Sequence, residues 1–157
     1  MRHPISTMAW LIVVALTAAA PALAQQGGAQ SVDAAWMSAM KANDINGILR
    51  CYAPDAVAWL PGMPTARGEQ AIRSAYQGLL SANVVKDVTI PDAAYKTTGN
   101  LSVGWGTFTL TLLSKDTGQS AVMTGRFTEV AELRGARWVY IVDHASADPA
   151  PPDTAKQ

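Results

Sequence analysis

The spacing of apolar residues changes once along this chain, at Val84, and this change constrains the fold more than any other feature. Before Val84 the apolar residues recur at the spacing of amphipathic helices. After it they alternate with polar residues, as in β-strands. Helices grouped ahead of a run of strands are typical of an α+β domain, in which helices cover one face of a sheet. We therefore expect three N-terminal helices packed on an antiparallel sheet.

Three segments carry the helical spacing. The first is expected to begin after an N-cap at Ser31 and to bury one stripe of residues: Val32, Ala35, Trp36, Ala39 and Met40. The second lies between Asn43-Asp44 and Pro54, which stops it, and its apolar stripe is Ile45, Ile48, Leu49 and Tyr52. The third runs from Glu69 to Asn83, with Ile72, Ala75, Tyr76, Leu79 and Leu80 on its buried face.

Strands are expected in the remaining segments. A short one, Ala56 to Leu60, lies between the second and third helices and ends at Pro61-Gly62. Beyond Val84, residues 84–90 and 93–97 read as one long strand interrupted at Pro91. Three more strands follow, separated by short turns: residues 101–113, 120–132 and 138–145. Short turns between consecutive strands predict antiparallel hairpins.

Residues 1–24 have the three-part pattern of a secretory signal peptide. Arg2 is followed by an apolar run from Met8 to Ala20 and by an Ala22-Leu23-Ala24 cleavage site. The run is short for a membrane span, which needs about 20 residues, although an uncleaved anchor is the alternative. We expect an exported protein, periplasmic or secreted, without a stable membrane anchor after cleavage. Residues 25–30 would then be a spacer, 31–147 the domain and 148–157 a disordered Pro-rich tail.

Composition excludes several classes of function. The formal net charge is +0 and no Lys/Arg run is present, so nucleic-acid binding has no electrostatic support. The single cysteine, Cys51, excludes an internal disulfide and a Cys-based zinc site, and we expect it to be a small buried hydrophobe. The mature chain has no His pair, Asp-rich loop or nucleotide-binding glycine motif. We therefore expect neither a metal nor a cofactor.

Several stretches together carry a family resemblance. They are Asp44–Leu49, Tyr52–Val57, Pro61, Gly68–Ile72, Tyr76, Gly125–Thr128 and Trp138–Ser146. The chain resembles the SnoaL-like, or nuclear-transport-factor-2-like, cone superfamily over residues 31–147, and most closely its exported domain-of-unknown-function 4440 (SgcJ/EcaC-like) group. This resemblance implies a strongly bent sheet, a cystatin-like cone with an internal pocket for a small apolar ligand, and a homodimer formed through the outer face of the sheet.

The ketosteroid isomerases of this superfamily offer a comparison of catalytic positions. Their general base is an aspartate before the proline that ends the first strand, and the matching residue here is Leu60. Their helix tyrosine corresponds to Trp36, and their second donor falls near Gly125. This chain therefore lacks that catalytic set. The two histidines of scytalone-dehydratase-like members are also missing, because His144 is the only histidine left after signal cleavage.

Three other residues have alternative roles. His144 is either an acid/base group in the pocket or a structural histidine, and we favour the second because the adjacent Asp143 faces the other side of the strand. Arg126 either meets a carboxylate or enolate in the pocket or is an exposed, salt-bridged residue. Asp55, at a helix-to-strand corner, is expected to accept backbone N–H bonds.

Two functions remain open. One is a binding protein that holds a small apolar or weakly acidic molecule. The other is a small acid/base enzyme of isomerase, dehydratase or cyclase type that uses His144 and Arg126. The residues expected to contact the ligand are Trp36, Tyr52, Trp59, Tyr76, Trp105, Met123, Arg126 and Trp138. A pocket that contains His144, Arg126 or Asp143 beside another polar group would favour the enzyme, and a wholly apolar pocket would favour the binding protein.

Overall fold

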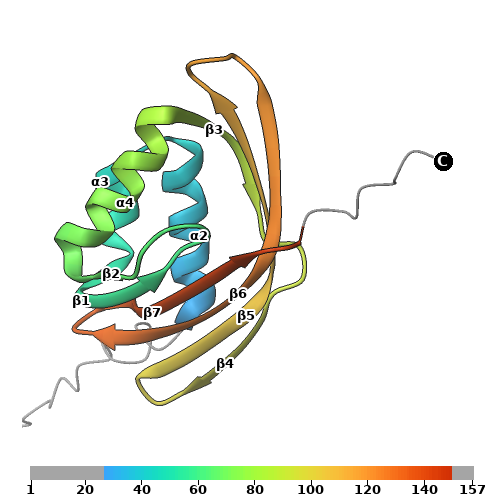
Figure 1. The fold of residues 1–157 in the computed structure, drawn as a ribbon. Helices are drawn as coiled ribbons and strands as arrows, with labels where there is room; N and C mark the ends of the chain where they lie inside the picture. Colours follow the sequence, from blue (N-terminus) through green and yellow to red (C-terminus); the bar gives the residue numbers. More distant parts are fainter. Residues whose placement is uncertain (1–26, 150–157) are drawn as a thin grey trace, which may run out of the picture.

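The computed structural model describes residues 27–149, so the predicted signal segment and nearly all of the predicted tail lie outside the described residues. Helices α2 (Gly28–Lys41) and α3 (Ile45–Arg50) come first, followed by β1 (Tyr52–Trp59), β2 (Ala66–Arg67) and α4 (Gly68–Ala82). The remaining elements are the strands β3 (Asn83–Thr89), β4 (Ala94–Thr98), β5 (Leu101–Ser114), β6 (Ser120–Arg134) and β7 (Arg137–Ala147). The helices cover the concave face of one curled sheet, which confirms the α+β class (Figure 1). The three helices are not all N-terminal, however, because β1 and β2 lie between α3 and α4.

The sheet is mixed rather than purely antiparallel. Its strand order is β2-β1-β7-β6-β5-β3, and β4 also pairs with β5. β1 and β7 are parallel, while the other pairs are antiparallel. The prediction of an antiparallel sheet was therefore wrong for this pair. Parallel neighbours need a long connection between them, and here α4 and all of β3–β6 form it.

The two short strands before β5 share that strand as a partner. β3 pairs with the C-terminal half of β5 and β4 with its N-terminal half. The segment that the sequence suggested as one interrupted strand is thus two strands on one long neighbour. Gly125 in β6 lies where this curled sheet leaves no room for a side chain. A Cβ there would be 2.2 Å from the Ser146 carbonyl oxygen and 2.6 Å from the Phe108 ring.

The helix boundaries differ from the prediction at two places. α2 begins at Gly28, so part of the expected spacer is helical. Ser31 lies inside its first turn, donating its hydroxyl to the Gly28 carbonyl at 2.8 Å. The buried stripe of α2 is also rotated, because Asp33 is buried and Ala35 is exposed. α3 ends at Arg50, and Tyr52 is the first residue of β1.

Pro54 lies within β1 rather than after a helix. The pairing of β1 with β7 shifts register between Tyr52 and Val57, and proline is tolerated at such an irregularity because it has no N–H to donate. The strand therefore begins earlier than the predicted Ala56.

The core lies between the helices and the concave face of the sheet. Its most completely buried side chains include Met40, Ile48, Ile72 and Val88. Cys51 is buried and free, as predicted, and its thiol donates to the Gly47 carbonyl at 3.5 Å. Burial raises the pKa of this thiol to about 11. Among residues 27–149, no helix is long and apolar enough to cross a membrane.

The convex face of the sheet carries exposed aromatic residues. Strand register places Trp59, His144, Thr128 and Trp105 in one row across β1, β7, β6 and β5. Trp59 and Trp105 are 39% and 44% exposed. A sheet face that only meets water normally presents polar residues, so this row is unusually apolar for a free surface.

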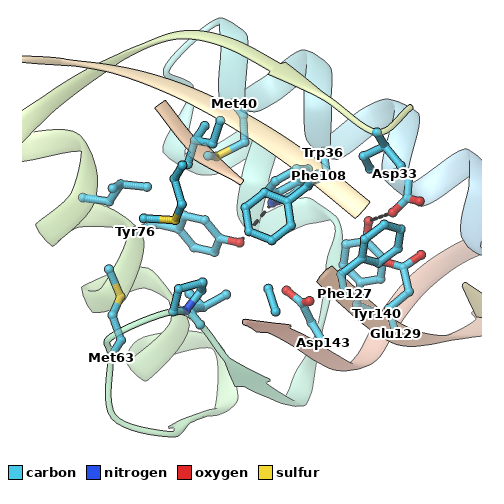
Figure 2. Close-up of a pocket in the computed structure, with 17 residues that line it drawn as sticks. Asp33, Trp36, Met40, Met63, Tyr76, Phe108, Phe127, Glu129, Tyr140 and Asp143 are labelled. Carbon is cyan, nitrogen blue, oxygen red and sulfur yellow. Dashed lines mark hydrogen bonds between the residues drawn. The ribbon is translucent and has the colours of Figure 1, made fainter. Parts of the chain in front are cut away.

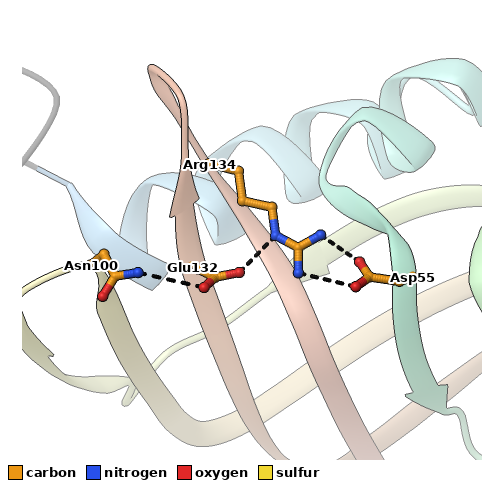
Figure 3. Close-up of polar contacts among 4 residues, drawn as sticks. All are labelled: Asp55, Asn100, Glu132 and Arg134. Carbon is orange, nitrogen blue, oxygen red and sulfur yellow. Dashed lines mark hydrogen bonds and ion pairs between the residues drawn. The ribbon is translucent and has the colours of Figure 1, made fainter.

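A polar cluster joins β1 to the end of β6 (Figure 3). The Asp55 carboxylate accepts two bonds from the Arg134 guanidinium, at 2.5 and 3.2 Å, and Arg134 also donates to Glu132 at 2.6 Å. The side-chain bond from Arg134 and the backbone N–H of Asp55 itself lower the pKa of Asp55. The role predicted for Asp55, accepting backbone N–H groups, thus describes only part of its contacts.

Candidate functional site

A cavity of about 100 Å³ lies between the helices and the concave face of the sheet. Most of its wall is apolar and comes from α2, α4, the loop after β1 and strands β5–β7. The apolar residues of the wall include Trp36, Met40, Leu60, Pro61, Met63, Leu79, Ile90, Phe108, Leu110, Met123, Phe127 and Ala145. The polar residues that reach it are Asp33, Tyr76, Glu129, Tyr140 and Asp143. Figure 2 shows the Asp143 carboxylate pointing into this space, with Asp33, Glu129 and Tyr140 gathered at one end.

Asp143 is the carboxylate nearest the middle of the cavity. Alternation along β7 turns Asp143 inward, where it is buried, and turns His144 outward, where it is exposed. The Tyr52 hydroxyl donates to Asp143 Oδ2 at 2.5 Å. Burial raises the pKa of Asp143 to about 6, although the bond from Tyr52 opposes this shift. The Asp143 carboxyl therefore gains or loses its proton close to neutral pH.

A chain of hydrogen bonds leads from α2 to this carboxylate. The Trp36 indole donates from Nε1 to the Tyr76 hydroxyl at 3.0 Å, and the Tyr76 and Tyr52 hydroxyls are 2.7 Å apart. Because the single Tyr52 proton goes to Asp143, Tyr76 must be the donor in the tyrosine pair. All three donors thus point toward Asp143. Burial raises the pKa of both tyrosines, so their hydroxyls stay protonated.

A second acidic cluster lies at the end of the cavity. Asp33 accepts hydroxyl bonds from Tyr140 at 2.5 Å and from Tyr95 at 2.6 Å. Glu129 is 3% exposed, and burial, followed by the charge of Asp33 and a hydrogen bond with it, raises the Glu129 pKa to about 11. Glu129 is therefore a neutral acid at pH 7. Its Oε1 has no hydrogen-bond partner and lies beside Gly104, where a Cβ would come within 2.6 Å of it.

The residues that the sequence predicted to contact the ligand fall into three groups in the structure. Trp36, Tyr76 and Met123 line the cavity, and Tyr52 lies behind it, bonded to Asp143. Trp59 and Trp105 are exposed, and Trp138 is buried beside a separate groove between α2, α3 and the β6–β7 turn.

His144 and Arg126, the two residues predicted as candidate catalytic groups, do not line the cavity. His144 contacts the Trp59 ring edge-on, with centroids 6.1 Å apart, on the outer face. Arg126 is also exposed, and it pairs with Asp148 at 3.3 Å. The two residues therefore do not lie together at one site with the cavity's polar groups.

Sequence reasoning missed Asp33 and Glu129. It named Asp143 only as one of three residues whose presence in the pocket beside another polar group would favour an enzyme, and Asp143 is the one that lies there, bonded to Tyr52. Asp33 shares a helix face with Trp36 and Met40 at i, i+3 and i+7, so it was a charge on an apolar stripe. Glu129 alternates with Phe127 and Ala131 on β6, which was the corresponding signal in a strand. A buried carboxyl on an otherwise apolar face indicates a functional site more strongly than an exposed arginine does.

The polar groups of the cavity suit proton exchange and hydrogen bonding. Within residues 27–149, no group of three or more His, Cys, Asp or Glu side chains could hold a metal ion. Asp143 can accept or release a proton near neutral pH, and neutral Glu129 cannot. Leu60, which the family resemblance matches to the ketosteroid isomerase base, lines the cavity with an apolar side chain.

Solved structures share this fold. A Xanthomonas campestris protein named after the calcium/calmodulin dependent protein kinase II association domain is 26% identical, with a TM-score of 0.70 over 85% of this chain and 95% of its own. A ketosteroid isomerase-like protein from Erwinia carotovora is 17% identical, with a TM-score of 0.68 over 77% and 94%. A nuclear transport factor 2-like protein from Salmonella enterica is 17% identical, with a TM-score of 0.70 over 86% and 97%.

Comparison with curated proteins found no match. The model of the SnoaL-like domain matches residues 34–141, which is more than half of the chain. The finer assignment to the domain-of-unknown-function 4440 group stays a prediction. The chain belongs to the SnoaL-like domain family, and its fold is shared by the nuclear transport factor 2-like protein from Salmonella enterica.

Proposed function

We propose that this protein binds a small, largely apolar molecule in the cavity, with the polar end of that molecule against Asp143. The observation that carries this proposal is a largely apolar wall around the inward-pointing carboxylate of Asp143. An engineered apolar cavity of about 150 Å³ holds one benzene molecule. A cavity of about 100 Å³ therefore matches a ligand, or a ligand portion, about the size of one ring.

Benzene tests the binding function, with the Trp36 indole N–H signal in NMR as the reporter. Benzene should shift this signal, because Trp36 forms part of the wall. Leu110→Phe fills the cavity and should abolish the shift. Leu101→Phe is the matched control on the same strand, since Leu101 is 43% exposed. Equal shifts in both variants, or no shift in the unmodified protein, would contradict the proposal.

Proton transfer is a second candidate function, and Asp143 specifically favours it. Its carboxylate is buried in the cavity, its pKa is raised to about 6 by burial, and hydrogen bonds from Tyr52 and, through it, Tyr76 hold it in place. A positioned carboxylate with a pKa near the working pH is suited to general base catalysis. This proposal replaces the pair His144 and Arg126 with a residue that lines the cavity.

Hydrogen exchange on a ligand that copurifies with the protein tests this second function. The ligand is identified by mass spectrometry, and loss of its carbon-bound hydrogen is followed in heavy water. Asp143→Asn should abolish the exchange, whereas His144→Gln, on the outer face, should leave the rate within about threefold of the unmodified protein, the effect of roughly 0.6 kcal/mol. Exchange that survives in Asp143→Asn, or is lost in His144→Gln, would refute the role of Asp143.

A further inference from the structure

The acidic groups of the cavity have no cationic partner there. Three carboxyl side chains reach it, and none of the 17 described residues that line it is lysine, arginine or histidine. Arg126, whose guanidinium was the reason to expect a weakly acidic ligand, is paired with Asp148 on the surface. Of the four effects on the pKa of Asp143, the effect of His144 is the smallest. The cavity therefore attracts positive charge and repels negative charge.

The hydrogen-bond donors around the cavity are already in use. Trp36, Tyr76 and Tyr52 donate along the chain that ends at Asp143 Oδ2. Tyr95 and Tyr140 donate to Asp33, and the neutral Glu129 is hydrogen-bonded to the same carboxyl. The capacity left for a ligand is an acceptor, Oδ1 of Asp143, because the bond from Tyr52 uses only Oδ2. A ligand that brings donors is complementary to this wall, and one that brings only acceptors is not.

Aromatic side chains form much of the remaining surface. Trp36, Phe108, Phe127 and Tyr140 surround the space into which Asp143 points. Aromatic ring faces attract cations, and the attraction is stronger when the cation has been removed from water. A carboxylate beside several aromatic rings in a largely apolar cavity thus favours an organic cation over a neutral molecule of the same shape.

We propose that the ligand of this cavity is a small aliphatic or single-ring amine in its protonated form, with its ammonium group on Asp143 and its hydrocarbon part against the apolar wall. This inference rests on the proposed binding function, which it makes more specific. An ammonium group supplies up to three donors and a positive charge, which are the two features that the wall lacks.

Three probes of similar size and different charge test the inference. They are 3-methylbutylamine, 3-methylbutan-1-ol and 3-methylbutanoate, each measured at about pH 7.5 through the Trp36 indole N–H signal. At this pH an alkylammonium, like a lysine side chain with a pKa of about 10.4, is charged. Asp143, with a pKa of about 6, is then ionised. We expect the amine to bind at least about tenfold more tightly than the alcohol, a difference of about 1.4 kcal/mol, and the carboxylate not to bind.

Variants then assign the preference to one residue. Asp143→Asn should weaken amine binding about tenfold or more and change alcohol binding by less than about threefold, differences of roughly 1.4 and 0.6 kcal/mol. Asp148→Asn, which removes an exposed carboxylate just after β7, is the matched control and should change neither. The probe series on the unmodified protein decides the inference even if Asp143→Asn does not fold. Alcohol or carboxylate binding as tight as amine binding would overturn the amine assignment and leave the binding function standing. If neither benzene nor any of the three probes binds, the amine assignment and the binding function are both overturned.

Discussion

The buried carboxyl of Glu129 should make the protein less stable as the pH rises, and replacing Glu129 with glutamine should remove this pH dependence. The carboxyl is buried beside Asp33, and burial raises its pKa from the ordinary value of 4.5 to about 11. Between these two values the unfolded chain loses the proton while the folded protein keeps it. The free energy of unfolding therefore falls as the pH rises through this range. Glutamine has the shape of the neutral acid and can donate an N–H to Asp33, but it does not titrate.

The expected magnitude follows from the slope of this linkage. One proton of difference changes the free energy of unfolding by about 1.4 kcal/mol per pH unit. Between about pH 6.5 and pH 9 the stability advantage of Glu129→Gln over the unmodified protein should therefore grow by about 3 kcal/mol. Asp143, whose pKa is raised to about 6, contributes its own loss mainly below this range, so it adds little to the difference.

Urea unfolding of both proteins at the two pH values measures this difference. Glu132→Gln is the control, because Glu132 lies on the same strand in a surface ion pair with Arg134. Its replacement should change stability by under about 1 kcal/mol, equally at both pH values. Parallel curves for Glu129→Gln and the unmodified protein would refute the reasoning, since they would mean that Glu129 is ionised in the folded state.

Four further expectations follow from the structure. Gly125→Ala should destabilise the fold by about 1–3 kcal/mol or more in thermal unfolding, because its Cβ would overlap the Ser146 carbonyl and the Phe108 ring; an unchanged melting temperature would contradict the tight curl. The Cys51 thiol, buried and with its pKa raised to about 11, should not react with a thiol reagent at pH 8 until the protein is unfolded, and rapid reaction of the folded protein would count against its burial. We propose a two-fold homodimer through the outer face of the sheet, so Trp105→Glu should convert a dimeric mass in light scattering to a monomeric one, and a monomeric mass for the unmodified protein would exclude the dimer. We also propose export with cleavage after Ala24, so N-terminal sequencing of the mature protein should begin at Gln25; retention of Met1 in a membrane fraction would rule this out.

The order of elements was predictable because each element has its own periodicity. The apolar spacing of α4, through Ile72 and Tyr76, and the alternation along β5 are local properties of the sequence. The partner of β1 was not predictable in the same way. Its parallel pairing with β7 depends on how the whole sheet curls, and no local pattern encodes that.

The site was harder to predict than the fold because both faces of β6 carry apolar as well as charged residues. Arg126 and Glu129 lie on opposite faces, and period two alone does not say which face is inside. The neighbours of Glu129, Phe127 and Ala131, are the more strongly apolar set, and burial follows them. Tyr52 was among the residues expected to contact the ligand, but it was placed on a helical stripe. It begins β1, at a junction where a helical stripe and a strand overlap in the sequence.

The interior position of β7 has a consequence for how the chain acquires its structure. β7 is the last strand to be synthesised, yet it lies between β1 and β6. Until it is made, those two strands present unpaired edges, and Asp143 is not yet there to accept the bond from Tyr52, 91 positions earlier in the chain. Pairings over such separations are slow to form and leave the nascent chain open to association with other proteins. The sheet between β1 and β6, and the contact of Tyr52 with Asp143, can therefore be completed only after β7 has been synthesised.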